Sequence, residues 1–469
     1  MSNIQYYNEN AQTFFDGTIK LDMHNLYSRF TKLLPNEANI LDAGCGSGRD
    51  TFNFEKMGYV VDAFDASIEL AKLASEYTGN DVKVSTFQTF TSNIRYDGIW
   101  CCASLLHVPE AELRHAIVNM RDHLVPYGHM YLSFRVGETE TEHNGRTFTN
   151  MTVDRLKEHI YFTGLEIVDA WTTDDVRPDR TNTWLNVIVQ YVPIFQLLSD
   201  YHTEFSEDNI FIHPYAEHIN LLIAGDFGTV SAKNRYTRLI SKVCEYYKTV
   251  TLVPGNHEFY GYNIRGTYNF LRELEETLDN FTFLNKNYVK VDGVYVIGCT
   301  LWTDLMKDPA NLWLIQDCMN DYRKIRHGSY ETPYSNKLTI MDTMEFNNDQ
   351  RNYIFATHKA IREYDPLAKT IILTHHAPLF ESASTKDIDP RLNAAYMNDY
   401  SEFIKLNSPS YWCHGHIHEY KLYKFCDTMV YCNPVGYVSY EGSEYTGCIL
   451  TETFTIPDIH IDTHEPRVA

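Results

Sequence analysis

The sequence has 469 residues, of which 44% are hydrophobic and 22% are charged, and its formal net charge is -22. A chain of this length is too long for one ordinary hydrophobic core, so we expect a globular protein with two domains. The excess of acidic residues offers no positively charged surface for duplex nucleic acid, so nucleic acid is not the favoured partner. A metal centre could still attract a phosphate locally.

The cysteines and the apolar runs indicate in which cellular compartment the protein is expected. None of the ten cysteines forms a CxxC pair, and the first residues show neither the basic region nor the apolar region of a secretory signal. No apolar run approaches the roughly 20 residues that a membrane-spanning helix needs. We therefore expect a soluble cytoplasmic protein without a disulfide scaffold and without a membrane partner.

The first predicted elements are a helical region, a strand, a glycine turn and a helix. Apolar residues recur at helical spacing over 10–34. A short apolar strand at 38–41 then runs into the glycine-rich turn Asp42–Gly48, and a helical pattern resumes over Arg49–Met57. This arrangement is typical of a nucleotide site, because glycines let the backbone approach a ligand and the helix N-terminus offers unpaired N–H groups.

A second strand, Tyr59–Phe64, ends at Asp65. This acidic residue follows the turn by about 20 residues, where a carboxylate can bind two ribose hydroxyls. The glycine turn alone fits a tight strand-to-helix connection equally well, so it is the pair of signals that indicates a nucleotide-like ligand.

These motifs resemble those of the class I S-adenosylmethionine-dependent methyltransferases over residues 4–191. The likeness rests on ILDAGCGSGRD at 40–50, VDAFDAS at 61–67, YDGIWCCASLLHVP at 96–109, LVPYGHMYLSF at 124–134 and GRTFT at 145–149. It implies a Rossmann-like seven-stranded domain that binds S-adenosyl-L-methionine and transfers its methyl group. The absence of an NPPY-like tetrapeptide after the fourth strand argues against a DNA amino-methyltransferase, and the methyl acceptor stays unknown.

The same resemblance implies roles for individual residues. Asp42, Gly44 and Gly46 would hold the methionine part of the cofactor, and Asp65 would hold its ribose. The segment Cys102–Ser104 would line the adenine side or the substrate side.

Other positions in this half admit two interpretations. Gln88 stands where many members of the family have an acidic residue against the adenine amine, and we expect it to make that contact instead. His107 fits either a base or a histidine that closes a loop. Arg49, Arg146 and Arg177 fit either an anionic substrate or a solvated surface, and solvation is the simpler interpretation of any one of them.

Two apolar runs, Leu185–Val189 and Ile194–Leu198, meet at Pro193. Proline lacks the N–H that a continuous central strand would need, so we predict two strands. The first strand would close one sheet and the second would open another. We therefore expect one domain over 1–192 and a second over 193–469.

The second half holds five short polar blocks, each at the end of an apolar run. They are Asp200-x-His202, Gly225-Asp226, Gly255-Asn256-His257-Glu258, His375-His376 and Gly415-His416-x-His418. In the D-x-H and H-x-H blocks, an extended chain with its period of two would turn both side chains the same way, so that they could grip one ion. Oxygen and nitrogen ligands without a thiolate favour a catalytic site for Mn, Fe or Zn.

Each block alone could be a turn or an ordinary histidine pair, whereas five of them in this order indicate a metal centre. Against two divalent cations, the carboxylates of Asp200 and Asp226 leave a net positive charge that an anionic phosphate can balance. The pattern therefore suits phosphoester hydrolysis.

The blocks resemble those of the calcineurin-like metallophosphoesterases, over residues 194 to about 460. The matching stretches are LLSDYHTEF, LLIAGDFG, TLVPGNHEFYG, ILTHHAP and CHGHIHE, the last followed by YCNPVGY. The resemblance implies a four-layer αββα fold with two ions, each held by three residues and joined by a bridging carboxylate. The ligands would be Asp200, His202 and His418 for one ion, Asn256, His375 and His416 for the other, and Asp226 between them.

The resemblance also implies the residues around these ligands. His257 would lie beside the phosphate, to stabilise charge or protonate the leaving oxygen, with Glu258 orienting it. His375 is expected to be the ligand rather than His376, because members of the family commonly use the first histidine of this pair. Phe227 follows the GD pair where an acidic or amide residue is usual, so we expect no support for the ligands from that position.

Three further stretches, GCTLWTDL, MNDYRKI and LNAAYMNDY, resemble an insert of a bacterial and phage-encoded subgroup of this family. Within them, Trp302, Asp304, Arg323 and Tyr396 are candidates for a wall of the substrate site. The aromatic residues among them fit a hydrophobic core equally well.

Together the patterns predict an α/β protein, a Rossmann-like methyltransferase domain followed by a four-layer metallophosphoesterase domain. We expect a bifunctional enzyme that uses S-adenosyl-L-methionine and two divalent metal ions and acts on a small-molecule or nucleotide phosphoester. In the alternative, the first domain only binds S-adenosyl-L-methionine, as a sensor or docking module. A third possibility is a nucleic-acid end-processing enzyme, against which the acidic balance argues.

Overall fold

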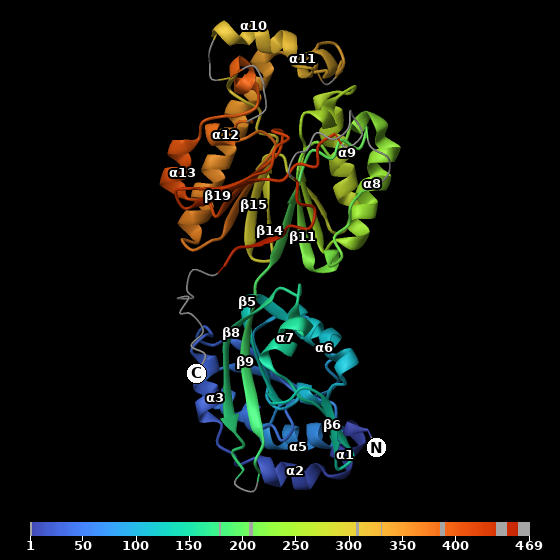
Figure 1. Ribbon diagram of the computed structural model, residues 1–469, viewed down its shortest axis with the longest axis vertical. Helices are drawn as coiled ribbons and strands as arrows, with labels where there is room; N and C mark the ends of the chain where they lie inside the picture. The colour runs from blue at the N-terminus through green and yellow to red at the C-terminus, as the bar shows by residue number, and fades with distance from the viewer. Residues whose placement is uncertain are drawn as a thin grey trace. The chain divides into compact units, whose positions relative to one another are not determined.

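The computed structural model describes residues 2–177, 180–205, 210–305, 309–329, 331–384, 390–437 and 448–457. The chain divides into two compact units, one built on Met1–Pro193 and the other on Ile194–Ile456 (Figure 1). Each unit is described by itself below. In the described part of the chain, no helix is long and apolar enough to cross a membrane.

The first unit is built on one sheet. Its strands are β1 (Asn39–Ala43), β2 (Val60–Asp65), β3 (Lys83–Val84), β4 (Tyr96–Cys101), β5 (Leu124–Arg135), β8 (Leu165–Asp174) and β9 (Thr183–Tyr191). They lie in the order β3-β2-β1-β4-β5-β9-β8, with parallel pairing up to β5 and antiparallel pairing of β9 with β5 and β8. The order reverses between β1 and β4, where open α/β sheets bind ligands. The predicted Rossmann-like seven-stranded fold is confirmed.

Both faces of this sheet are buried, because successive side chains of each strand enter opposite cores. Ile40 of β1 and Trp100 of β4 belong to one apolar cluster, whereas their chain neighbours Leu41 and Ile99 belong to the other. The helices that cover the sheet are α1 (Asn3–Glu9), α2 (Ala11–Thr18), α3 (His24–Thr31), α4 (Arg49–Lys56), α5 (Ile68–Thr78), α6 (Glu110–Asp122) and α7 (Val153–Ile160). A separate two-stranded sheet pairs β6 (Glu140–His143) with β7 (Arg146–Thr149).

The helical region predicted over 10–34 is divided into α2 and α3. The division lies at Asp22, whose Oδ1 accepts a hydrogen bond of 2.9 Å from the N–H of His24, the first residue of α3. Aspartate favours such a local turn because its side chain competes for backbone N–H groups. The two strands predicted around Pro193 are present: β9 lies in the first sheet and β10 (Ile194–Leu198) in the second unit.

The second unit contains two sheets. The five-stranded sheet consists of β10, β11 (Ile219–Ala224), β12 (Thr249–Val253), β13 (Phe281–Phe283) and β20 (Phe454–Thr455), in the order β13-β12-β11-β10-β20. The six-stranded sheet consists of β14 (Asn287–Val291), β15 (Val294–Cys299), β16 (Thr370–Thr374), β17 (Tyr411–His414), β18 (Lys421–Phe425) and β19 (Thr428–Cys432), in the order β14-β15-β16-β17-β19-β18.

The two sheets pack face to face and carry helices on their outer faces (Figure 1). Leu197 of β10 and Leu222 of β11 share a buried apolar cluster with Val296 of β15 and Ile371 of β16. The helices α8 (Lys233–Tyr246) and α9 (Ile264–Thr277) cover the first sheet, whereas α12 (Ile340–Tyr364) and α13 (Ser401–Asn407) cover the second. The predicted four-layer αββα fold is confirmed.

Candidate functional site

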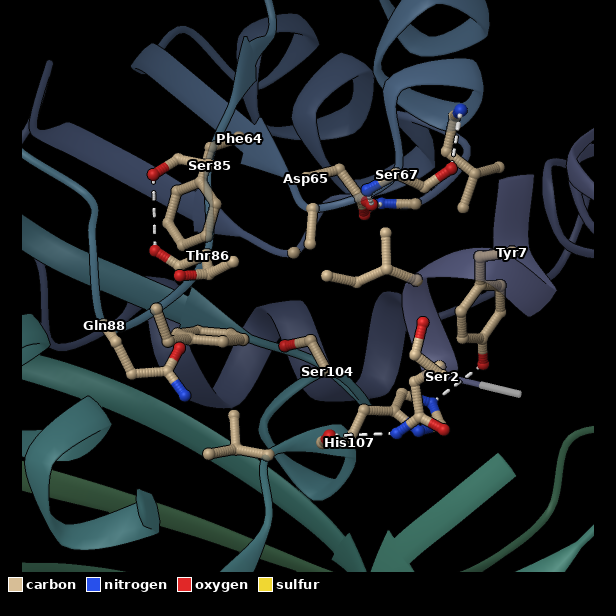
Figure 2. Close-up of a pocket in the computed structure, with 18 of the residues that line it drawn as sticks. Ser2, Tyr7, Phe64, Asp65, Ser67, Ser85, Thr86, Gln88, Ser104 and His107 are labelled. Atoms are coloured by element: carbon tan, nitrogen blue, oxygen red, sulfur yellow. Dashed lines mark hydrogen bonds between the residues drawn. The ribbon is translucent and has the colours of Figure 1, made fainter. Parts of the chain in front are cut away.

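A cavity of about 570 Å³ lies in the first unit, beyond the carboxyl ends of β1, β2 and β4 (Figure 2). The loop after β1 supplies Gly44 and Gly46, the end of β2 supplies Asp65, and the loop after β4 supplies Ser104. Cavities of roughly 300–1,000 Å³ are typical of small-molecule and cofactor sites.

Asp65 is held in the wall of this cavity by backbone N–H groups. Its Oδ2 accepts a hydrogen bond of 2.9 Å from Gly46, and its Oδ1 accepts one of 2.8 Å from Ser67. Burial raises the pKa of this carboxyl, although the backbone hydrogen bonds oppose the shift. A ligand whose hydroxyl groups donate hydrogen bonds to Asp65 would replace the water that this carboxylate loses on burial.

The turn after β1 needs its glycines for space. Gly44 has φ of +75°, and a Cβ atom on it would lie 2.6 Å from Cβ of Ser104. Asp42, which we expected against the methionine part of the cofactor, lies behind the turn and does not line the cavity. It is buried and accepts a hydrogen bond of 2.6 Å from Oγ1 of Thr51 in α4, so it ties the strand to the helix.

The other predicted residues divide between two cavities. Gln88 lines the first cavity, where its Nε2 donates a 2.7 Å hydrogen bond to Glu112. Ser104 also lines the first cavity, whereas Cys102 lines a second cavity of about 150 Å³. The second cavity is lined by the predicted arginines as well, namely Arg49, Arg146 and Arg177. The two cavities share the wall residues Tyr7, Phe14, Gly44, Gly46, Ala103 and His107.

His107 lies in this shared wall with both ring nitrogens engaged (Figure 2). Nδ1 lies 3.2 Å from the carbonyl oxygen of Thr147, which can only accept, so Nδ1 carries the proton and Nε2 accepts from the Tyr7 hydroxyl at 2.8 Å. Burial and the charge of Arg146 together lower the pKa of His107 to about 4, against the opposing effect of the backbone hydrogen bond to Thr147. The ring is therefore neutral near pH 7, and its role as a base stays a prediction.

The second unit brings the predicted metal ligands together. Asp200, His202 and His418 form one group whose candidate ligand atoms all lie within 4.8 Å of one another, and Asp226, His375 and His416 form another. Oδ1 of the predicted ligand Asn256 lies 2.9 Å from Nε2 of His375.

Asp226 lies between the two groups. Its Oδ2 is 3.9 Å from Nε2 of His202 in the first group, and its Oδ1 is 3.5 Å from Nε2 of His375 in the second. One carboxylate thus offers one oxygen to each group, which is the geometry of a bridging ligand.

The donor atoms fit two divalent cations. Nε2 of His202 faces Nε2 of His418 at 3.0 Å, and Nε2 of His375 faces Nδ1 of His416 at 3.1 Å. A proton shared between two nitrogens bonds those two atoms alone. A metal cation instead binds the lone pairs of both nitrogens and of carboxylate oxygens as well. The carboxylates of Asp200 and Asp226 are fully buried, and buried charges of this kind require counter-charges.

The backbone at these ligands differs from the extended chain that we expected. β10 ends at Leu198 and β17 at His414, so both the D-x-H and the H-x-H block lie in loops. Five of the predicted ligands have left-handed backbone: Asp200 (φ 52°), His202 (φ 46°), Asp226 (φ 54°), His416 (φ 68°) and His418 (φ 51°). Each such residue costs roughly 1–3 kcal/mol, and strain of this kind clusters at functional sites. The side chains converge because of these turns and not because of a strand period.

The centre leaves no room for side chains on its glycines. A Cβ atom on Gly255 would lie 2.1 Å from Oδ1 of Asp226, and one on Gly225 would lie 2.5 Å from Nδ1 of His375. His375 donates through Nδ1 to the carbonyl oxygen of Ala224 at 2.8 Å, which leaves Nε2 for the centre. Nδ1 of His376 instead lies 3.4 Å from the carbonyl oxygen of Thr300.

His257 is oriented by a carboxylate that we did not predict. Nδ1 of His257 lies 2.7 Å from Oε1 of Glu204, and its backbone N–H donates to Oδ1 of Asp226 at 2.8 Å. Burial lowers the pKa of His257, but Asp226 and Glu204 outweigh burial and raise it overall. Glu204 stands two residues after His202, so a D-x-H-x-E pattern in the sequence was the signal for it.

The prediction that Glu258 orients His257 is wrong. Glu258 is fully buried and points at the backbone, where it accepts hydrogen bonds from the N–H groups of Asp226 at 2.9 Å, Phe227 at 2.8 Å and Gly255 at 2.6 Å. It therefore ties the loop that carries Asp226 to the loop that carries Gly255 and Asn256. Glu258 thus supplies the support for the ligands that we did not expect from Phe227, the residue after the GD pair.

The insert contributes two residues to the centre, of which one was predicted. The ring of Tyr396 stacks on His416 at 4.8 Å. Asp321, which was missed, accepts hydrogen bonds of 2.8 Å from Nδ2 of Asn256 and from the hydroxyl of Tyr260. It thereby directs the amide oxygen of Asn256 toward His375.

The remaining insert candidates lie elsewhere. Trp302 is 2% exposed within an apolar cluster, so it belongs to the core. Arg323 is exposed and donates to the carbonyl oxygen of Cys318 and to Asn320. The backbone N–H of Asp304 donates to Asn398 at 3.2 Å.

Replacing Glu204 with glutamine is expected to lower kcat for phosphoester hydrolysis roughly 10- to 100-fold, because partners that orient site histidines have effects of this size. The metal content should stay within twofold of the wild type, since all the predicted ligands are unchanged. Steady-state kinetics and elemental analysis check both values. An unchanged kcat would show that Glu204 does not orient His257 for the reaction.

The fold and the two sites define a protein with a Rossmann-like methyltransferase fold and a metallophosphoesterase fold. A family model described as a methyltransferase domain matches residues 15–173, and one described as a calcineurin-like phosphoesterase matches residues 198–420. An uncharacterized protein of Acanthamoeba polyphaga mimivirus is 30% identical over 230 residues, which are 46% of this chain and 78% of that protein. The chain therefore carries a methyltransferase domain followed by a calcineurin-like phosphoesterase domain.

Solved structures that are similar to parts of the chain include two enzymes. The 1,6-didemethyltoxoflavin-N1-methyltransferase of Burkholderia thailandensis is 21% identical, with a TM-score of 0.34, over 41% of this chain and 91% of that one. The phosphopantetheinyl hydrolase of Mycobacterium tuberculosis is 15% identical, with a TM-score of 0.43, over 59% of this chain and 99% of that one.

Proposed function

We propose that the chain is a bifunctional enzyme, whose first domain transfers a methyl group from S-adenosyl-L-methionine and whose second domain hydrolyses a phosphoester with two divalent metal ions. The observation that carries the second activity is the position of Asp226, with one oxygen toward each group of ligands. Divalent ions, when bound, polarise a phosphoester and lower the pKa of water.

The residues of this chain perform the other parts of the hydrolysis. Asp200, His202 and His418 would hold one ion, Asn256, His375 and His416 the other, and Asp226 both. Glu204 engages Nδ1 of His257, so Nε2 is the nitrogen that can stabilise the phosphoryl group or protonate the leaving oxygen. The histidine and its carboxylate partner are both largely buried, which strengthens their interaction with an anionic substrate.

Methyl transfer is supported by the pair of cavities in the first domain. The larger cavity has the size and the position of a cofactor site, and the smaller one shares part of its wall. A domain that only sensed S-adenosyl-L-methionine would need the first cavity alone. A second cavity beside it provides a place for an acceptor, and positioning the acceptor against the methyl group is the main source of rate enhancement in this chemistry.

Hydrolysis of bis-p-nitrophenyl phosphate and p-nitrophenyl phosphate tests the phosphoesterase. We expect turnover of at least one of them that is lost in chelator and restored by Mn²⁺, Fe²⁺ or Zn²⁺. Preferential cleavage of the diester would direct the search to nucleotide diesters, and cleavage of the monoester alone would define a phosphatase. Protein that retains two bound ions and hydrolyses neither these esters nor a panel of nucleotide and small-molecule phosphoesters would overturn the proposal.

A further inference from the structure

The second cavity of the methyltransferase domain is positively charged, although the chain as a whole is strongly acidic. Among the residues that the structure describes, its wall contains five arginines against three aspartates, an excess of two positive charges. The arginines are Arg49, Arg135, Arg146, Arg177 and Arg180, and the aspartates are Asp50, Asp174 and Asp175. A basic cavity in a chain of net charge -22 calls for a specific anion.

Among the described residues, acidic partners neutralise two of these arginines. Arg49 forms a two-pronged ion pair with Asp50, through Nε at 2.7 Å and Nη2 at 2.9 Å. Arg177 forms another with Asp175, at 2.8 and 2.7 Å. These pairs fix the two aspartates, so neither carboxylate is available to the other arginines.

Arg135, Arg146 and Arg180 form no ion pair with any described residue. The Nε atoms of Arg135 and Arg146 are buried without a hydrogen-bond partner. Both guanidinium groups rest on the ring of Phe148, at 3.8 and 5.1 Å from its centroid, which holds them in place without neutralising them. Burial lowers the pKa of Arg135, and the charges of Arg146, Arg180 and Arg177 lower it further.

The location of this charge relates it to methyl transfer. The basic cavity shares Gly44 and Gly46 with the cofactor cavity, and these glycines belong to the turn that the family resemblance places against the methionine part of the cofactor. An anion bound by Arg135 and Arg146 would therefore lie on the side of the cofactor that carries the methyl group. The volume of about 150 Å³ suits a small molecule, since one water occupies roughly 30 Å³ in the liquid.

We propose that the methyl acceptor is a small molecule carrying an oxyanion, a carboxylate or a phosphate, and that Arg135 and Arg146 bind this oxyanion with Arg180 beside them. Guanidinium groups match both anions through paired hydrogen bonds. The acidic remainder of the chain disfavours an anionic polymer, whereas a small anion can enter the basic cavity. This inference rests on the proposed methyl transfer and names the chemical class of its acceptor.

The transfer itself balances without a further reactant. The nucleophilic atom of the acceptor donates its lone pair to the methyl carbon, and the sulfur keeps the electron pair of the broken C–S bond. Any proton on the nucleophilic atom passes to water. The arginines touch only the oxyanion, so their task is to position the acceptor.

Binding of inorganic phosphate and of benzoate to the full chain tests the proposal by calorimetry. The protein is loaded with S-adenosylhomocysteine and kept in chelator, so that the phosphoesterase centre does not bind phosphate through metal ions. We expect one site for at least one of the two probes, and which probe binds distinguishes a phosphate from a carboxylate. Binding should weaken at least tenfold in Arg135→Gln and in Arg146→Gln, and less in Arg146→Lys, which keeps the charge. No binding of either probe at 10 mM, on the order of the weakest affinities of interest, would overturn the proposal.

Two controls distinguish the loss of the anion site from the loss of the fold. Arg29→Gln, which removes an exposed ion pair with Asp169, should leave anion binding unchanged. All variants should bind S-adenosylhomocysteine within threefold of the wild type, which shows that the domain is folded. Transfer of labelled methyl to a neutral or cationic acceptor, unaffected by Arg135→Gln, would overturn this inference while leaving the proposed function intact. Anion binding that needs Arg135 in a protein without transferase activity would instead count against the proposed methyl transfer, while the anion site itself would stand.

Discussion

Replacing Asp226 with asparagine is expected to lower kcat/KM for phosphoester hydrolysis by about 10³-fold or more, because this change removes charge from both metal sites at once. Asparagine has nearly the same shape as aspartate, so the backbone N–H of His257, which donates to Oδ1 at 2.8 Å, can keep an oxygen acceptor. The fold should therefore survive while the affinity for both ions falls.

The measurement combines kinetics at saturating Mn²⁺ with elemental analysis of the purified protein. The matched control is Asp427→Asn, because Asp427 is an aspartate of the same domain whose side chain is 82% exposed, in a surface ion pair with Lys424. The control should keep full activity and full metal content. If Asp226→Asn retained both activity and two bound ions, Asp226 would not be the bridging ligand.

The second large effect is expected at Asp65. Asp65→Ala should weaken binding of S-adenosylhomocysteine roughly 100-fold, since two hydrogen bonds from a ribose to a carboxylate are worth about 3 kcal/mol or more. The substitution also removes the acceptor for the N–H of Gly46, which loosens the turn that the cofactor would contact.

Calorimetric titration with S-adenosylhomocysteine gives this value directly. Asp81→Ala, an exposed aspartate after α5, is the matched control and should bind like the wild type. Thermal unfolding of the variant without ligand should shift to a somewhat lower temperature, because the N–H groups of Gly46 and Ser67 lose their acceptor, while a single cooperative transition would show that the domain is folded. Unweakened binding by Asp65→Ala would show that the first cavity does not hold the ribose through this residue.

The order of the elements could be predicted from local patterns. Strand, glycine turn and helix around Gly44, and the paired apolar runs on either side of Pro193, follow from backbone conformations that neighbouring residues determine. Both folds and the composition of both ligand groups were predictable through the family resemblances that motifs of a few consecutive residues carry.

The partners around those motifs were not predictable in the same way. Glu258 was expected to serve His257, its neighbour in the chain, yet it holds the N–H groups of Asp226 and Phe227. Glu204 orients His257 although 53 positions separate them. A carboxylate pairs with whichever donor is close in space, and spacing along one loop says nothing about the loop that packs against it.

The arginines of the basic cavity were likewise recognisable as one site only once the fold was known. Each of Arg49, Arg146 and Arg177 fits a solvated surface when it is considered alone, and Arg135 lies within a strand that gives no signal of a site. The fold brings these arginines into one wall and neutralises only some of them.

The sequence by itself therefore determined the residue types of the ligand groups and the family resemblances that indicate the two folds, because the glycine turn and the D-x-H, GNHE and H-x-H blocks are runs of a few neighbouring residues. Only the tertiary structure decided the left-handed turns that aim those blocks, the carboxylates that orient them and the charge left unpaired beside the cofactor cavity. These features depend on packing between segments far apart in the chain, and electrostatic pairing acts over distances in space.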